Sequence, residues 1–382
     1  PALFPETVEA TIERGTDQDT WAVDTIGLPV NNPWFSMIKP GGLDLFTDGD
    51  SAAICTWNGD VWIVKGLKSG DGTVHWQRFA TGLYEPLGLR IVDDIVYVNC
   101  RDQITRLHDQ NQDGEADRYE CFNNDVYITA NFHEFTFGLQ TDQDGNFYLA
   151  KGAPVRAGGR GFERILPHNG TLLRIAKDGK KLDVIATGLR APGGIGVGPN
   201  GEITTGENEG TWQPCCKLNY FTQPDTFLGV EDAAHQLKGQ AMHLPLCYFP
   251  MCTDNSGGGQ VWVPPTVDWG QKAGELIHLS YGKSSLYRVL RQEVDGLMQG
   301  GVVRIPVTLN SSAMRARFHQ DGSLYVLGFR GWQTNAAKTQ GLQRIRYTGQ
   351  PVTIPNRLEA TEKGIYIGFE KQLDPATVAD PF

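Results

Sequence analysis

An alternation of acidic and amide side chains in one short segment is the first feature of this sequence that could do chemistry. The pattern is D-x-N-x-D-G-x-x-D, and its members are Asp109, Asn111, Asp113 and Asp117. Oxygen ligands at alternating positions, with a glycine for the bend, are typical of calcium loops, and Glu120 stands at the twelfth position of an EF-hand pattern. The flanks alternate as strands, so we predict a structural calcium in a hairpin. The alternative is a plain polar turn.

The seven cysteines are a second set of reactive side chains. None belongs to a C-x-x-C-H haem site or a paired C-x-x-C zinc site. Three pairings are predicted by proximity: Cys247 with Cys252, Cys100 with Cys121, and the adjacent Cys215 with Cys216. Such disulfides would favour an oxidising compartment, whereas the alternative is a set of buried thiols.

The elements that must position these groups form a repeat of a polar turn followed by alternating apolar residues. The units are NGDVWIV (58–64), VDDIVYV (92–98), QDGNFYLA (143–150), PNGEITTG (199–206), GELIHLSYG (274–282) and QDGSLYVLG (320–328). Alternation with period two indicates half-buried strands, and N-G or D-G indicates tight hairpins. Segments 172–189, 285–294 and 342–349 follow three of the units and are predicted to continue each as strand, turn and strand.

Six such units predict an all-β fold, a six-bladed β-propeller with four-stranded antiparallel blades, because blades of about 40–50 residues are typical of propellers. A β-sandwich is the alternative. We expect residues 1–40 to form a lead-in that packs on the propeller, 41–351 to form the propeller, and 352–382 to begin a truncated β-sandwich-like segment. The helix candidates are short, at 6–14 and 232–239.

The composition excludes some classes of partner. The 382 residues carry 34 Lys and Arg against 44 Asp and Glu, a formal charge of −10, with no run of basic residues. Nucleic acid is therefore a poor partner, because phosphate binding needs clustered cations. No apolar stretch approaches the roughly 20 residues that span a bilayer. Since the chain starts at Pro1, we expect a processed product from which an export signal was removed, and we expect the native protein to continue beyond Phe382.

Residues 40–350 resemble the glucose/sorbosone dehydrogenase superfamily of six-bladed propellers. The matching segments are HEFTFGLQTDQDGNFYLAKGA (133–153), TGLRAPGGIGVGPNGEITTGENEG (187–210), LIHLSYGKSSLYRV (276–289) and SAMRARFHQDGSLYVLG (312–328). Within it, DTIGLPVNNPWFSMIKPGGLDLFTDG and DNSGGGQVWVPP are similar to large secreted proteins of Planctomycetes and Verrucomicrobia, called membrane-bound dehydrogenases and often fused to cytochrome c. This resemblance implies a periplasmic or secreted protein with pyrroloquinoline quinone as cofactor.

The resemblance also implies roles for individual residues. His133 matches the general base that acts on the sugar hydroxyl. Arg190, Lys283 and Arg315 match positions that hold the quinone and its carboxylates, and Arg317 is a rival of Arg315 in the alignment. Ala191 stands where the family has asparagine, so one expected polar contact with the cofactor is missing.

A second group is expected to meet the substrate. Glu207 and Glu209 lie in an acidic turn that helps to place calcium in the dehydrogenases, Trp212 beside them could stack on a sugar ring, and Arg330 could rim the channel.

Three functions follow from these expectations. The first is an extracytoplasmic oxidoreductase that oxidises a sugar or alcohol with the quinone and passes electrons to a cytochrome partner or fused haem domain. The second is a polysaccharide lyase or hydrolase in which His133 shares acid–base work with Glu207 or Glu209. The third is a non-catalytic carbohydrate-binding or scaffold propeller. Fold alone does not choose among them.

Overall fold

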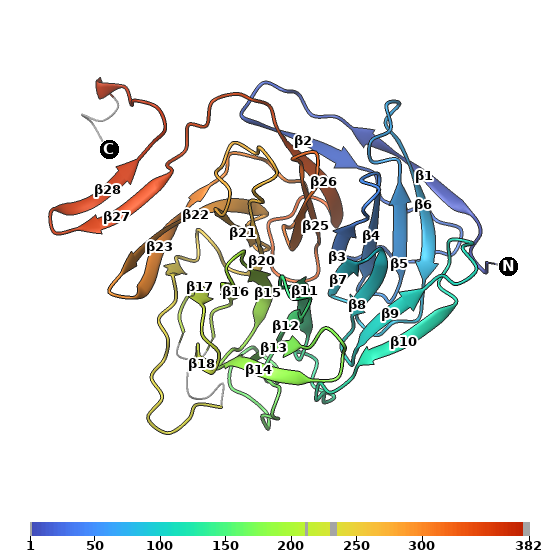
Figure 1. Cartoon of the computed structure of the whole chain (residues 1–382), viewed down its shortest axis with the longest axis horizontal. Helices are drawn as coiled ribbons and strands as arrows, with labels where there is room; N and C mark the ends of the chain where they lie inside the picture. The colour runs from blue at the N-terminus through green and yellow to red at the C-terminus, as the bar shows by residue number, and fades with distance from the viewer. Residues whose placement is uncertain (1, 211–212, 230–234, 377–382) are drawn as a thin grey trace.

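The computed structural model describes residues 2–210, 213–229 and 235–376. Every named element within these ranges is a β-strand, and the strands gather into mostly antiparallel sheets around a common centre (Figure 1). This confirms the prediction of an all-β, propeller-like fold with four-stranded antiparallel sheets. In the described ranges, no helix has the length and apolar character needed to cross a membrane.

Four sheets follow the chain as meanders. The second sheet along the chain contains β7 (Gly88–Val92), β8 (Ile95–Asn99), β9 (Ile104–His108) and β10 (Arg118–Asn123). The third contains β11 (Thr136–Thr141), β12 (Phe147–Lys151), β13 (Thr171–Ile175), β14 (Leu182–Thr187) and the short parallel β18 (Thr226–Phe227). The fourth contains β15 (Pro192–Val197), β16 (Ile203–Glu207), β17 (Cys216–Phe221) and β19 (Cys247–Phe249). The fifth contains β20 (Gly257–Trp262), β21 (Leu276–Ser280), β22 (Ser285–Val294) and β23 (Leu297–Arg304).

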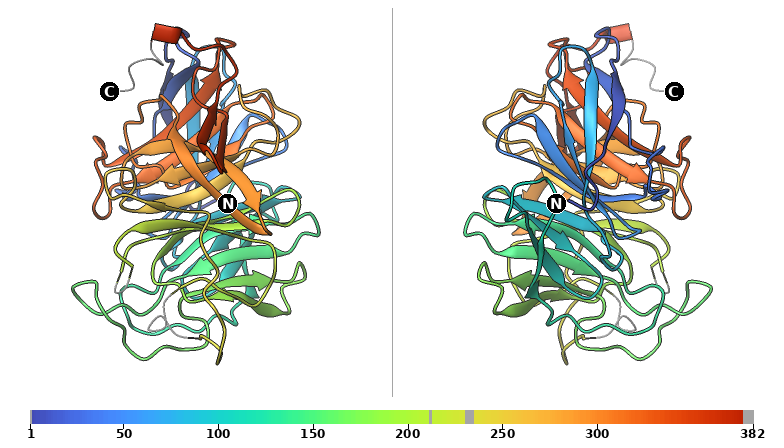
Figure 2. Two further views of the ribbon diagram at one scale, coloured as in Figure 1. Left: turned by 90° about the vertical axis from the view of Figure 1, so that its left-hand side faces the viewer. Right: turned by 90° about the vertical axis from the view of Figure 1, so that its right-hand side faces the viewer.

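The first and last parts of the chain share one nine-stranded sheet. Its order is β24 (Arg315–Phe318), β25 (Leu324–Phe329), β26 (Gln340–Tyr347), β2 (Trp21–Ile26), β1 (Thr7–Glu13), β6 (Thr73–Ala80), β5 (Val61–Lys65), β4 (Ser51–Thr56) and β3 (Pro40–Leu45). β2 pairs with β26 along its whole length, whereas β1 and β2 pair at only two positions. Figures 1 and 2 show these blue N-terminal strands against the red C-terminal ones. The N-terminal strands therefore join the two ends of the ring of sheets.

The innermost strand of each sheet packs against its neighbours around the centre. Contacts run in the order β3, β7, β11, β15, β20 and β24, and β24 returns to β3. Glycines permit this close approach: a Cβ on Gly193 would lie 1.9 Å from the carbonyl oxygen of Gly257, and one on Gly88 would lie 2.2 Å from that of Gly138. Apolar side chains of adjacent sheets fill the spaces between them as buried clusters.

The predicted turns fall in equivalent places in five of the six units. Units 92–98, 143–150, 199–206, 274–282 and 320–328 each lead into the second strand of a sheet. Unit 58–64 instead leads into the third strand, β5, and the turn equivalent to the others is T-D-G-D at 47–50, before β4. The misplacement arose because the strand after that turn, SAAICT, carries small residues that hide the alternation.

Two other expectations from sequence differ from the structure. Residues 6–14 were predicted as a helix but contain β1, whose side chains alternate strictly between exposed and half-buried positions. Of the candidate at 232–239, residues 232–234 lie outside the described part, and 235–239 form no helix. Segments 285–294 and 342–349 were each predicted as strand, turn and strand, but they supply only the single strands β22 and β26, whose outer neighbours are β23 and β2.

The C-terminal segment forms a separate hairpin of β27 (Arg357–Thr361) and β28 (Gly364–Gly368). It lies beside β22, where the Gln292 side chain exchanges two hydrogen bonds with the backbone of Ala360.

Candidate functional site

In each sheet, the loop before the first, innermost strand and the loop after the second strand lie at the same face of the molecule. We call this face the His133 face. In an antiparallel meander, the start of the first strand and the end of the second share one edge of the sheet. Contacts between sheets join these edges: Arg101 donates to the carbonyl of Asn131, and Arg190 Nη2 donates to the carbonyl of Gly159 at 2.9 Å. His133, Arg190, Glu207, Lys283 and Arg330 all belong to this face.

His133 lies in the loop before β11, partly exposed. Its Nδ1 lies 3.2 Å from the carbonyl oxygen of Ala153, so this nitrogen carries the proton and donates it. Its Nε2 makes no hydrogen bond within the described residues, which leaves that lone pair free. Burial, and then the charge of nearby Arg190, lower the pKa of His133 to about 4. The imidazole is therefore neutral at ordinary pH and can accept a proton at Nε2.

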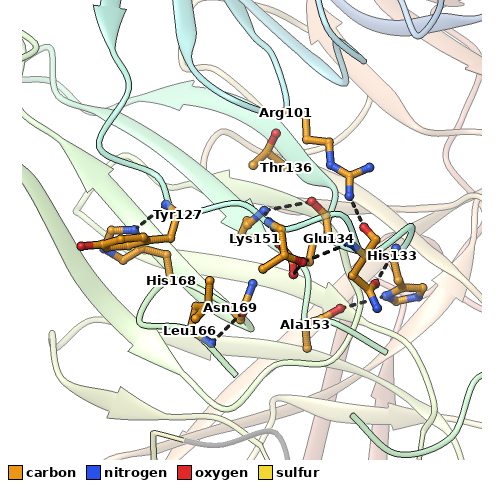
Figure 3. Close-up of polar contacts among 12 residues, drawn as sticks. Arg101, Tyr127, His133, Glu134, Thr136, Lys151, Ala153, Leu166, His168 and Asn169 are labelled. Atoms are coloured by element: carbon orange, nitrogen blue, oxygen red, sulfur yellow. Dashed lines mark hydrogen bonds and ion pairs between the residues drawn. The ribbon is translucent and has the colours of Figure 1, made fainter. Parts of the chain in front are cut away.

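A buried polar network holds the His133 loop in place (Figure 3). Asn131 Oδ1 accepts the His133 backbone N–H at 2.8 Å, and Arg101 donates to the Asn131 carbonyl. Beneath them, Lys151 Nζ donates to the backbone oxygen of Glu134 at 2.9 Å and lies 3.5 Å from its carboxylate. Both side chains are fully buried, and burial lowers the pKa of Lys151 to about 8. These contacts fix the backbone of the loop that carries His133, the candidate general base.

Arg190 and Glu207 form the next part of the site. The Glu207 carboxylate accepts the backbone N–H groups of Arg190 and of Ala191, the latter at 2.7 Å, so it fixes the loop that carries Arg190. Glu207 is buried, and desolvation raises its pKa to about 6. It faces Lys217 across the strand pair β16–β17. This position makes Glu207 a positioning residue, although the sequence predicted contact with substrate.

The remaining predicted residues are placed separately. Glu209 accepts a contact from the Cys216 thiol at 3.4 Å. Lys283 follows β21, and its Nζ has no partner in the described ranges. Arg330 is exposed after β25, close enough to Tyr281 to influence its pKa. Trp212 lies outside the described residues. Trp332, two residues after Arg330, stacks on Tyr281 with ring centroids 4.1 Å apart.

Arg315 does not take the predicted place at the face. It is buried, and its guanidinium donates to the carbonyl oxygens of Leu87, Gly193 and Met314. Its rival Arg317 donates to Leu139 and lies 3.3 Å from the Asp44 carboxylate. Both arginines cross the centre and join innermost strands to one another. Burial lowers the pKa of each to about 10.

The Asp109 loop joins β9 to β10 and lies at the edge opposite the His133 face. Its own N–H groups occupy its oxygens: Asp109 accepts from Asp113 and Gly114, and Asp117 accepts from Gln110 and Asn111. Glu120 instead accepts hydrogen bonds from Arg106. Nowhere in the described ranges do three His, Cys, Asp or Glu side chains form a group that could hold a metal ion. The loop is therefore held by its own hydrogen bonds, and calcium binding there stays a prediction.

The structure contains no disulfide, and all seven cysteines are free. Cys100 is buried in a core cluster with Cys55, whereas Cys121 is exposed on the outer strand β10, so that pair is separated. The Cys247–Cys252 and Cys215–Cys216 pairings are likewise not formed.

Sequence reasoning missed the residues that support His133. Asn131, Glu134, Lys151 and Arg101 were not singled out. One signal was available: the strand FYLAK ends in a lysine at a position whose neighbours are all buried. A lysine there needs a partner, because an unpaired buried charge is very costly.

Comparisons with known proteins relate the fold to that of sugar dehydrogenases. No family model and no curated protein matches the chain. Among solved structures, the PQQ-bound aldose sugar dehydrogenase of Streptomyces coelicolor shares 14% identity at a TM-score of 0.60, covering 90% of this chain and 99% of its own. The PQQ domain of pyranose dehydrogenase from Coprinopsis cinerea shares 11% at 0.59, covering 91% and 98%. A luciferin-regenerating enzyme shares 9% at 0.55, covering 89% and 96%.

Proposed function

We propose, starting from the propeller fold that this chain shares with sugar dehydrogenases, that it oxidises a sugar or alcohol with a pyrroloquinoline quinone-type cofactor. The observation that carries the proposal is His133: its imidazole is neutral, its Nδ1–H is held by the Ala153 carbonyl, and its Nε2 lone pair is free. That is the state a general base needs to take the proton of a sugar hydroxyl.

The residues at the face fit the cofactor in part. Arg190 keeps donors free beyond its bond to Gly159, and the Lys283 ammonium is unpaired within the described residues, so both could bind quinone carboxylates. Arg315 and Arg317 do not fit, because their donors are used on backbone carbonyls. A bound quinone would supply the two-electron acceptor. The chain itself would orient the sugar and take its proton at His133 Nε2.

The proposal also covers the number of blades, the bounds of the propeller, and the location and partner of the protein. Dividing the nine-stranded sheet between β1 and β2 gives six blades, with residues 41–351 as the propeller, 1–40 as a lead-in that adds strands to it, and 352–382 as a separate segment. Sequence resemblance supports a periplasmic or secreted location and a cytochrome partner or fused haem domain.

The other two functions have less support. A lyase needs a carboxylate to share acid–base work with His133, but Glu207 is committed to the loop backbone and Glu209 to Cys216. A carbohydrate-binding propeller would not need a neutral histidine with a free nitrogen.

Quinone binding and sugar-dependent dye reduction test the proposal directly. We expect pyrroloquinoline quinone to bind stoichiometrically, with a shift of its visible absorption, and dye reduction to appear with some member of a sugar panel. Arg190→Ala and Lys283→Ala should weaken quinone binding by about tenfold each, the value of a lost charge-assisted contact. Lys181→Ala, an exposed lysine at the opposite edge, is the control. Absence of quinone binding in the unaltered chain would reject the proposal.

Calcium stays a prediction that thermal unfolding can check. If the Asp109 loop binds calcium, saturation at 100 times Kd would add about 2.7 kcal/mol of stability. Asp113→Ala should abolish that gain. An unfolding midpoint that does not respond to calcium would leave the loop as a polar turn.

A further inference from the structure

Beside His133, a hairpin and the residues after it carry three arginines that have no ion pair with any other described residue. The hairpin belongs to the loop between β12 and β13, closed by the bridge between Val155 and Phe162 and turning at Gly158 and Gly159. Arg156, Arg160 and Arg164 are exposed, and within the described residues their guanidinium groups have neither an ion pair nor a hydrogen bond.

The hairpin is anchored on both sides of the candidate site. Asn131 Nδ2, in the His133 loop, donates to the Val155 carbonyl at 3.2 Å and to the Glu163 carboxylate at 3.0 Å. On the other side, Arg190 Nη2 donates to the Gly159 carbonyl. The acidic side chain of this segment, Glu163, is thus used to hold the hairpin in place. The arginines remain free.

Two exposed aromatic side chains lie on the segment before β11, whose Asn131 is bonded to this hairpin. Phe132 is 56% exposed and packs edge-on against the His133 ring at 5.7 Å, while Tyr127 is 54% exposed and contacts His168. Large exposed rings offer flat apolar surface of the kind that ligand sites use. Phe132 therefore lies against the His133 ring, and the basic hairpin is tied to the same loop through Asn131.

We infer that the substrate bound at this face is an acidic oligosaccharide. Its carboxylate or sulfate groups would bind Arg156, Arg160 and Arg164, and one of its rings would lie against Phe132. Charge complementarity supports this: a chain with a net charge of −10 carries, beside its candidate catalytic histidine, cations that have no ion pair among the described residues. Guanidinium groups match carboxylates and sulfates in both charge and geometry. This inference rests on the proposed function, since it names the substrate class of that site.

Calorimetric titration of the full chain without quinone tests the inference apart from turnover. The probes are trigalacturonate, a heparin-derived tetrasaccharide, neutral cellotriose and inorganic polyphosphate. We expect at least one acidic sugar to bind about tenfold more tightly than cellotriose, with an affinity that falls with salt. Binding of trigalacturonate alone would assign carboxylates, and binding of the heparin fragment alone would assign sulfates.

A pair of charge-matched variants tests whether the hairpin arginines are the groups that bind the acidic sugar. Replacing all three arginines by glutamine (R156Q/R160Q/R164Q) should weaken acidic-sugar binding by at least about tenfold. The control K177Q/K180Q/K181Q removes the same charge from the turn between β13 and β14, at the opposite edge of the same sheet, and should not change the affinity.

Three results would overturn the inference: no acidic sugar binds, the arginine variant binds as tightly as the unaltered chain, or polyphosphate binds as tightly as the sugars. Because no oxidation is measured, the oxidoreductase proposal can fail in its own assay while acidic-sugar binding stands. Likewise, acidic-sugar binding can fail in calorimetry while sugar oxidation is observed with a neutral substrate.

Discussion

Replacing His133 by alanine is expected to lower kcat/KM for sugar oxidation by about 10²–10⁴-fold, the usual contribution of a positioned general base. The loss should fall on turnover, because the loop remains tied through Asn131 and Glu134, whose bonds use backbone groups or neighbouring side chains. His75→Ala is the matched control, since His75 is an exposed histidine on β6. A His133→Ala enzyme with unchanged kcat/KM would exclude this histidine as the base.

The same residue sets the expected pH dependence. With a pKa of about 4, the imidazole is neutral above that value and protonated below it, so kcat/KM should fall as pH drops through about 4. The folded pKa lies below the ordinary value of 6.5, so the unfolded chain binds the proton first. Stability should therefore decline between about pH 6.5 and pH 4. In His133→Ala, both effects should be smaller.

Removing the buried lysine beneath the site is the second large change. Lys151→Met should lower the free energy of unfolding by about 3–5 kcal/mol, because it leaves the Glu134 carboxylate buried without its cation. Urea unfolding measures the loss. The double variant Glu134→Gln, Lys151→Met should recover part of it, since no charge is then left unpaired.

An exposed ion pair in the same sheet supplies the control. Lys181 lies 2.8 Å from Asp183 with most of its side chain in solvent, so Lys181→Met should cost no more than about 1 kcal/mol. If Lys151→Met lowered the free energy of unfolding no more than Lys181→Met does, the buried Lys151–Glu134 pair would not be what stabilises the loop that carries His133.

Features that depend on a few neighbouring residues could be predicted from the sequence, whereas features that depend on contacts between distant segments could not. Turn residues and period-two alternation act over a few positions, and they were enough to predict the all-β fold and most second strands. They failed at 6–14, where a short exposed strand was taken for a helix, and at 47–50, where small residues hid the repeat. They also gave no sign that β2, near the N-terminus, pairs with β26, since that register depends on residues more than 300 positions apart.

The sequence by itself determined the strand pattern, the acidic charge, the polar Asp109 loop and the choice of His133, because each is a property of residue type and short spacing. Only the tertiary structure decided which polar groups are free. In it, Arg315 and Glu207 bond to backbone groups, Lys151 is buried against Glu134, and Lys283 and the hairpin arginines have no partner among the described residues. The physical reason is that hydrogen bonding and burial are settled by segments far apart in the chain. One arginine, such as Arg315, can therefore bond to backbone carbonyls across the core, while another, such as Arg156, is exposed and available to bind a ligand.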